Sequence, residues 1–164
     1  MYRVIKTNRL TVRPIAISDG AFMLTLVNSP GWLKFIGDRN VYNIKDAEAY
    51  IQRILDNPLY FYHIIEMNGD KQPVGVISFL KRENQQYFDI GFALLPAYEG
   101  QGIAFEAASN YLNAIQSLQT FERIIAICIP DNLRSINLLK KLEFTYSSEL
   151  SEHNDGLSIF ELNN

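Results

Sequence analysis

The sequence predicts an α+β protein with a mixed, mostly antiparallel central sheet, one parallel βαβ pair and helices on both faces of the sheet. Three apolar runs with strand-like alternation follow one another with short turns between them, which is typical of an antiparallel meander. An amphipathic helical segment then leads into an apolar run without alternation, which indicates a strand covered on both faces. With 164 residues, 48% of them hydrophobic, the chain is the size of one domain, residues 1–164.

The N-terminal part of the chain predicts one strand and two helices. The strand is closed by Pro14 and carries alternating apolar residues, namely Leu10, Val12 and Ile15. A helix is expected to begin at Ser18, a residue type that caps helices, and to end at residues 28–31. A second helix follows Asn43, where apolar residues recur at helical spacing. Residues 29–45 are predicted to form an irregular connection.

The central meander consists of the predicted strands Tyr60 to Met67, Val74 to Leu80 and Tyr87 to Leu94. Turn residues separate the strands at Asn68-Gly69-Asp70 and around Glu83-Asn84. These short connections favour antiparallel neighbours.

The clearest helix covers residues 104–118, where apolar residues step by three and four. It leads into the apolar strand Arg123 to Ile129, so that strand, helix and strand form a right-handed βαβ unit. A last helix is expected to start near Asn132, and residues 144–162 predict a hairpin that turns near Asp155-Gly156.

Composition excludes several classes of protein. The net charge of -3 argues against a protein that mainly binds nucleic acid or an anionic membrane. One cysteine, Cys128, and two histidines provide no cluster with metal-ligand spacing, so no metal site is expected. The first 14 residues contain four basic residues and no apolar core of a signal peptide. We therefore expect a cytoplasmic protein.

The most informative segment is Gly100-Gln101-Gly102-Ile103-Ala104, which precedes the clearest helix. Small residues let the backbone approach a ligand, and the first N–H groups of a helix bind phosphate. The alternative is a tight turn in which the glycines serve backbone geometry alone. The Gly-x-Gly pattern by itself does not distinguish a phosphate-binding turn from a purely structural one. No Lys-Ser/Thr follows as in a P-loop, and Phe105 stands where a dinucleotide fingerprint requires a third glycine.

Two longer segments resemble one protein family. Asp89 to Ala107 (DIGFALLPAYEGQGIAFEA) is similar to the acetyl-CoA motif of the GNAT N-acetyltransferases, and Asn132 to Phe144 is similar to the motif that follows the covered strand in that family. Thr7 to Pro14 and the closing hairpin resemble the RimJ/RimL-like branch, which acetylates protein N-termini and other amines. The resemblance covers essentially the whole chain and implies a GNAT-like fold with acetyl-CoA as cosubstrate.

The resemblance also implies the residues that bind acetyl-CoA. The parallel strands splay apart at one end, and backbone groups freed there pair with the pantetheine and polarise the thioester carbonyl. The implied residues are the backbone of Phe92, Ala93 and Leu94, the turn Gly100, Gln101, Gly102, Ile103 and Ala104, and Asn132 and Ser135 at the start of the last helix.

Two departures from the family pattern affect the site. Glu99 places an acidic residue beside the expected diphosphate, where many members carry Arg or Gln. Leu139 stands where many members carry the tyrosine that protonates the departing thiolate. Ser135 is the candidate acid in its place, and the alternative is that Ser135 only caps the helix together with Asn132.

Asp89 is the candidate general base, directly or through a water, and the alternative is a carboxylate that only makes local hydrogen bonds. Glu66 and His63 are weaker candidates, and His63 is equally consistent with a core histidine. Cys128 lies in an isoleucine-rich run and is interpreted as a packing residue.

These observations predict acetyl transfer from acetyl-CoA to a primary amine by direct attack in a ternary complex. The acceptor would be a protein N-terminus or a small-molecule amine, with no nucleic acid or membrane partner, and the protein would be a monomer or homodimer. The acceptor would lie between the central strands and residues 29–45, in a groove lined by Trp32, Phe35, Asp38 and Tyr42; the alternative is that the aromatic residues there belong to the core. The alternative is a catalytically idle GNAT-like module that binds CoA or a protein partner.

Overall fold

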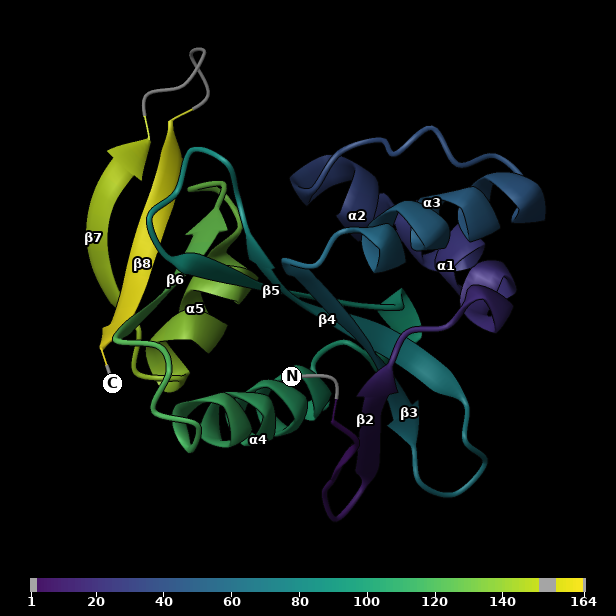
Figure 1. The fold of residues 1–164 in the computed structure, drawn as a ribbon, viewed down its shortest axis with the longest axis horizontal. Helices are drawn as coiled ribbons and strands as arrows, with labels where there is room; N and C mark the ends of the chain where they lie inside the picture. The colour runs from purple at the N-terminus through teal and green to yellow at the C-terminus, as the bar shows by residue number, and fades with distance from the viewer. Residues whose placement is uncertain (1–2, 151–155, 164) are drawn as a thin grey trace.

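The computed structural model describes residues 3–150 and 156–163. In chain order the elements are β1 (Ile5–Lys6), β2 (Leu10–Pro14), η1 (Ile17–Asp19), α1 (Gly20–Val27), α2 (Pro30–Phe35), α3 (Ile44–Asp56), β3 (Tyr60–Met67), β4 (Pro73–Lys81), β5 (Phe88–Leu94), η2 (Pro96–Tyr98), α4 (Ile103–Gln116), β6 (Arg123–Cys128), α5 (Leu133–Lys141), β7 (Thr145–Leu150) and β8 (Leu157–Asn163). The strands form one sheet in the order β1-β2-β3-β4-β5-β6-β8-β7. Figure 1 shows this sheet between two groups of helices.

The predicted fold class is confirmed. Strand β5 pairs with β6 in parallel, and the other neighbouring strands pair antiparallel. Helix α4 connects the parallel pair, as the βαβ interpretation requires.

Two apolar cores cover the two faces of the sheet. On one face, α4 and α5 bury residues such as Ile103, Tyr111 and Leu139 against the strands. On the other face, α1, α2 and α3 bury Met23 and Ile51 against β3 and β4. In Figure 1, α1–α3 and α4 accordingly lie on opposite sides of the strands.

The N-terminal elements differ from the prediction. Residues 29–45 are not wholly irregular, because Pro30 begins the short helix α2; proline is tolerated in the first turn of a helix, where its missing N–H has no intrahelical acceptor. The expected helix starts later than Ser18, at Gly20, after the single turn η1. Strand β1 has two residues and gave no sequence signal. Asp155, in the predicted hairpin turn, lies outside the described residues.

Among the helices that the structure describes, none is long and apolar enough to cross a membrane. Within residues 3–150 and 156–163, no three His, Cys, Asp or Glu residues are grouped as metal ligands would be.

Gly75 in β4 lets two strands approach closely next to the end of β5. A Cβ atom at Gly75 would lie 2.5 Å from the carbonyl oxygen of Ala93 and 2.4 Å from a methyl carbon of Leu94. The Ala93 oxygen belongs to the backbone, so a side chain at Gly75 would displace β5 itself.

We expect Gly75→Ala to lower the free energy of unfolding by about 1–3 kcal/mol, because the methyl group overpacks the contact with β5. Gly69→Ala is the matched control, since a Cβ at Gly69 meets nothing within 4 Å. It should change stability by less than about 0.5 kcal/mol. Urea denaturation of both variants measures the difference, and equal stabilities would contradict the close approach.

Candidate active site

The parallel strands β5 and β6 part from each other after a short contact. Their register covers two pairs, Phe88 with Ile124 and Asp89 with Ile125. Asp89 and Ile90 are buried, whereas every residue from Gly91 to Leu95 is half-buried. The backbone groups of Phe92–Leu94 that face β6 therefore have no ladder partner in that strand. The predicted splaying of the parallel pair is confirmed.

Asp89 lies at the point where the strands part. Its Oδ1 accepts a hydrogen bond from the N–H of Ile127 at 3.2 Å, and Ile127 would face Gly91 if the ladder continued. Its Oδ2 accepts from Nε of Arg82 at 2.7 Å. The carboxylate thus replaces the β5 backbone as the partner of a β6 N–H group, and Arg82 balances its charge.

Burial raises the pKa of Asp89 to about 6, although the positive charge and hydrogen bond of Arg82 and the hydrogen bond from Ile127 oppose this shift. The side chain is 3% exposed. Asp89 therefore changes protonation state close to neutral pH in the folded protein.

The turn before α4 presents free N–H groups. Gly100 and Gly102 both have a φ of 75°, the left-handed region that favours glycine. The first hydrogen bond of the helix runs from the N–H of Glu106 to the carbonyl of Gly102, so the N–H groups of Ile103, Ala104 and Phe105 lack an acceptor within the helix. Gly100, Gln101 and Gly102 are exposed. This geometry fits a diphosphate at the positive end of α4.

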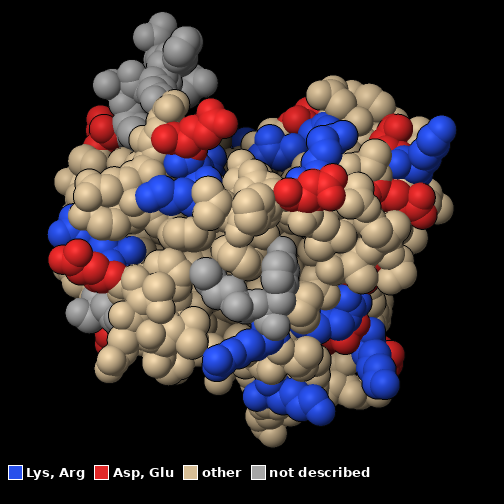
Figure 2. Space-filling view, viewed as in Figure 1, with Lys and Arg blue, Asp and Glu red and all other residues tan. Residues whose placement is uncertain are grey.

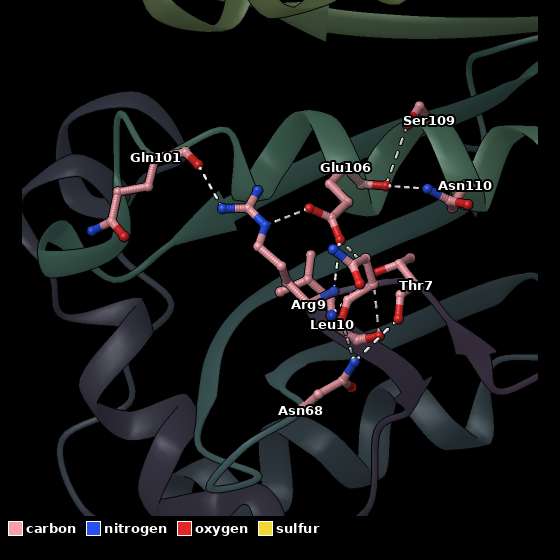
Figure 3. A network of polar contacts seen from close by, with 9 residues as sticks. Thr7, Arg9, Leu10, Asn68, Gln101, Glu106, Ser109 and Asn110 are labelled. Carbon is pink, nitrogen blue, oxygen red and sulfur yellow. Dashed lines mark hydrogen bonds and ion pairs between the residues drawn. The ribbon is translucent and has the colours of Figure 1, made fainter.

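A polar network that the sequence did not reveal surrounds this turn (Figure 3). Arg9 reaches from the segment before β2 to the carbonyl of Gln101 at 3.1 Å and to the Glu106 carboxylate at 2.7 Å. The hydroxyl of Thr7 donates to the same carboxylate at 2.6 Å. The burial of Glu106 opposes ionisation, but these hydrogen bonds outweigh it and lower its pKa.

Helix α5 starts beside the same turn. Asn132 is its N-cap, and its side-chain oxygen accepts from the N–H of Ser135 at 3.2 Å. Ser135 is half-buried, and its hydroxyl makes no hydrogen bond to the residues that the structure describes. Arg134 forms an ion pair with Glu99, which links the first turn of α5 to the residue before Gly100.

The remaining candidates are engaged in packing or ion pairs. Leu139 is buried in the core. Burial, together with the charge of Asp89, raises the pKa of Cys128 to about 11, which disfavours a nucleophilic thiolate. His63 is buried against Tyr111 of α4, and burial lowers its pKa to about 4. Glu66 accepts a hydrogen bond from Arg13 at 2.6 Å.

The residues expected to line an acceptor groove differ in their exposure to solvent. Trp32 is buried in the core under α1–α3. Tyr42 is exposed, and its hydroxyl donates to Asp38 at 3.2 Å. Trp32 therefore contributes to packing, and Tyr42 and Asp38 form a surface pair.

Comparison with known proteins identifies the family. Residues 9–145 match the family model described as "Acetyltransferase (GNAT) domain". This match spans most of the chain, so the chain belongs to the GNAT family. It is an acetyl-CoA-dependent N-acetyltransferase. The uncharacterized N-acetyltransferase YnaD of Bacillus subtilis (strain 168) is 28% identical over 138 residues, which cover 84% of this chain and 80% of YnaD.

Solved structures share the fold at lower identity. The acetyltransferase from Salmonella typhimurium that modifies the N-terminal serine of ribosomal protein L7/L12 superposes with a TM-score of 0.84 at 15% identity, covering 99% of both chains. The microcin C7 self-immunity acetyltransferase MccE, in complex with acetyl-CoA and AMP, superposes with a TM-score of 0.82 at 20% identity, covering 96% of this chain and 94% of MccE.

We expect Asp89→Asn to change the pH dependence of stability. With a raised pKa, the folded protein retains a proton between about pH 4 and pH 6 that the unfolded chain has already released. The free energy of unfolding of the wild type should therefore fall relative to the variant by about 2–3 kcal/mol as the pH rises from 4 to 7. Urea denaturation of both proteins at several pH values measures this difference, and a constant difference would contradict the burial of an ionisable Asp89.

Proposed function

We propose that this chain acetylates a primary amine, by direct attack of the amine on acetyl-CoA in a ternary complex. One observation carries the proposal: β5 parts from β6 immediately before a turn that exposes free N–H groups at the N-terminus of α4. A thioester with a diphosphate needs both features, unpaired strand groups for its pantetheine arm and a positive helix end for its phosphates.

The binding residues follow from this arrangement. The turn from Gly100 to Ala104 holds the diphosphate through its N–H groups and the dipole of α4. The free backbone edge of Phe92–Leu94 holds the pantetheine arm and polarises the thioester carbonyl. Asn132 and Ser135 border the arm from the start of α5.

Acetyl-CoA supplies the acetyl group as a thioester. The amine nitrogen forms a bond to the carbonyl carbon, the carbon–sulfur bond breaks, and the amine gives up a proton. The sulfur leaves as a thiolate and is protonated to the CoA thiol. Ser135 is the proposed donor to that sulfur, since its hydroxyl is uncommitted within the described residues and Leu139 has no proton to give.

Asp89 is the proposed proton acceptor. Its pKa near 6 suits a base at neutral pH. Both of its oxygens already accept hydrogen bonds, so a water between the amine and the carboxylate is the arrangement that supports this role. Its contact with Ile127 also gives Asp89 a structural role at the split.

The proposed acceptor is a protein N-terminus or a small-molecule amine, as in the RimJ/RimL-like branch. The Salmonella neighbour that modifies a ribosomal protein N-terminus supports this class through its fold. In Figure 2 acidic side chains lie among the basic ones over the upper part of the face, and the net charge of the chain is -3, which does not favour nucleic acid as the acceptor. We propose a cytoplasmic monomer or homodimer.

The release of free thiol from acetyl-CoA tests the proposal, with a panel of peptides bearing different N-terminal residues, polyamines and aminoglycosides. We expect thiol release that depends on one class of amine, with the acetylated amine detected by mass spectrometry. Tight binding of acetyl-CoA without turnover of any amine would overturn the proposed transfer and favour the binding-module alternative.

Ser135→Ala should lower kcat by about 10- to 1000-fold and leave the Kd for acetyl-CoA within about 2-fold, because only the donor to the thiolate is lost. Ser109→Ala is the matched control, since Ser109 is also a half-buried helix serine but bonds to the carbonyl of Glu106. Steady-state kinetics and calorimetry on both variants separate the two effects. Wild-type turnover in Ser135→Ala would remove the serine from the mechanism.

A further inference from the structure

Arg9 connects two segments that lie far apart in the sequence. Its Nη1 donates to the carbonyl of Gln101 at 3.1 Å, and its Nε donates to Oε2 of Glu106 at 2.7 Å. Its own carbonyl accepts from the N–H of Asn68 at 2.8 Å, which fixes its backbone to the end of β3. In Figure 3 the Arg9 side chain lies between the turn and the first part of α4.

The bond to Gln101 sets the direction of a phosphate-binding group. Peptide groups are planar, and the structure has no cis peptide among the described residues, so each N–H points away from the carbonyl of the same peptide. Because Arg9 holds the carbonyl of Gln101, the N–H of Gly102 must point away from Arg9. The hydrogen bond from Arg9 to Gln101 therefore orients the N–H group of Gly102 before any ligand binds.

The bond to Glu106 removes an electrostatic conflict. Glu106 lies in the first turn of α4, where its carboxylate would repel a diphosphate held by the same helix end. Its Oε1 accepts from Thr7 and from the Arg9 N–H, and its Oε2 from the Arg9 side chain. Both oxygens are thus held, and the charge of Arg9 cancels that of Glu106.

One nitrogen of the Arg9 guanidinium, Nη2, is not used in these hydrogen bonds. Nη2 of Arg9 lies 3.6 Å from the position of a Cβ at Gly102 and has no acceptor within the part of the chain that the structure describes. A positive N–H group is therefore placed beside the turn, on a side chain that is 42% exposed.

We propose that Arg9 is a positioning residue of the diphosphate-binding turn: it orients the Gln101–Gly102 peptide and neutralises Glu106, so that the N-terminus of α4 accepts an anion. This inference rests on the acetyl-CoA site proposed above. The segment before β2 thereby has a function in binding acetyl-CoA, and this function is separate from the acetyl-transfer step.

Arg9→Met tests the inference, with Arg123→Met as the matched control. Arg123 forms an ion pair with Glu161 of similar exposure, 35% and 21% against 42% and 18% for Arg9 and Glu106, at the opposite end of β6 from the split. We expect the Kd of Arg9→Met for acetyl-CoA to rise about 10- to 50-fold in calorimetry, while Arg123→Met stays within 2-fold of the wild type.

A second readout separates positioning from general damage. With S-acetyl-pantetheine, which lacks the diphosphate, KM should be the same in the wild type and Arg9→Met, and kcat at saturating acetyl-CoA should change less than about 2-fold. Adding Glu106→Gln to Arg9→Met should recover part of the affinity, because the unbalanced charge is removed. If Arg9→Met does not fold, Arg9→Lys, which cannot bridge both acceptors, should give an intermediate loss.

An unchanged Kd in a folded Arg9→Met, or an equal loss with S-acetyl-pantetheine, would overturn the inference and leave the proposed function intact. Failure of the wild type to bind acetyl-CoA would overturn both.

Discussion

The parting of β5 from β6 is the constraint on which the rest of the site depends. Buried backbone groups need hydrogen-bond partners, so two adjacent strands separate only where something else pairs with them. The carboxylate of Asp89 does this for the N–H of Ile127, and Arg82 balances its charge. Gly75 allows the end of β5 to approach β4 closely, on the side away from β6. The split is thus maintained by the side chains of Asp89 in β5 and of Arg82 in the turn before it, together with a backbone N–H of β6 and the close approach at Gly75 of β4.

The split and the helix N-terminus are adjacent because of chain connectivity. A parallel pair requires a crossover, and the crossover starts at the end of β5, where the strands have already separated. The single turn η2 and two glycines with positive φ then reverse the chain into α4 within a few residues. The free strand edge and the free N–H groups of the helix are therefore neighbours because they follow one another along the chain.

Local patterns explain why much of the fold could be predicted. Strand β3 has the predicted limits, since alternation and flanking turn residues mark both ends, and α4 and α5 follow their apolar spacing. Helix α2 is not predicted because Pro30 stands where the preceding helix is expected to end, although proline also begins helices. The proposed diphosphate-binding turn is visible in the sequence as a motif. The contacts Arg9–Glu106 and Asp89–Ile127 were not, because residues that far apart in sequence meet only in the folded chain, where α4 packs against β1 and β2 and where β5 lies beside β6.

Two acidic residues flank the proposed diphosphate-binding turn, and each is paired with an arginine. Glu99 precedes Gly100 and pairs with Arg134 from α5, and Glu106 follows the turn and pairs with Arg9 from the segment before β2. Each carboxylate would oppose a bound diphosphate if it stood alone, and each is neutralised by an arginine from a distant element. The pair at Glu99 has a further consequence, because Arg134 is the neighbour of Ser135. The contact that cancels the charge of Glu99 also links the first turn of α5 to the residue before Gly100, so the proposed proton donor lies on the helix that contacts the proposed diphosphate site.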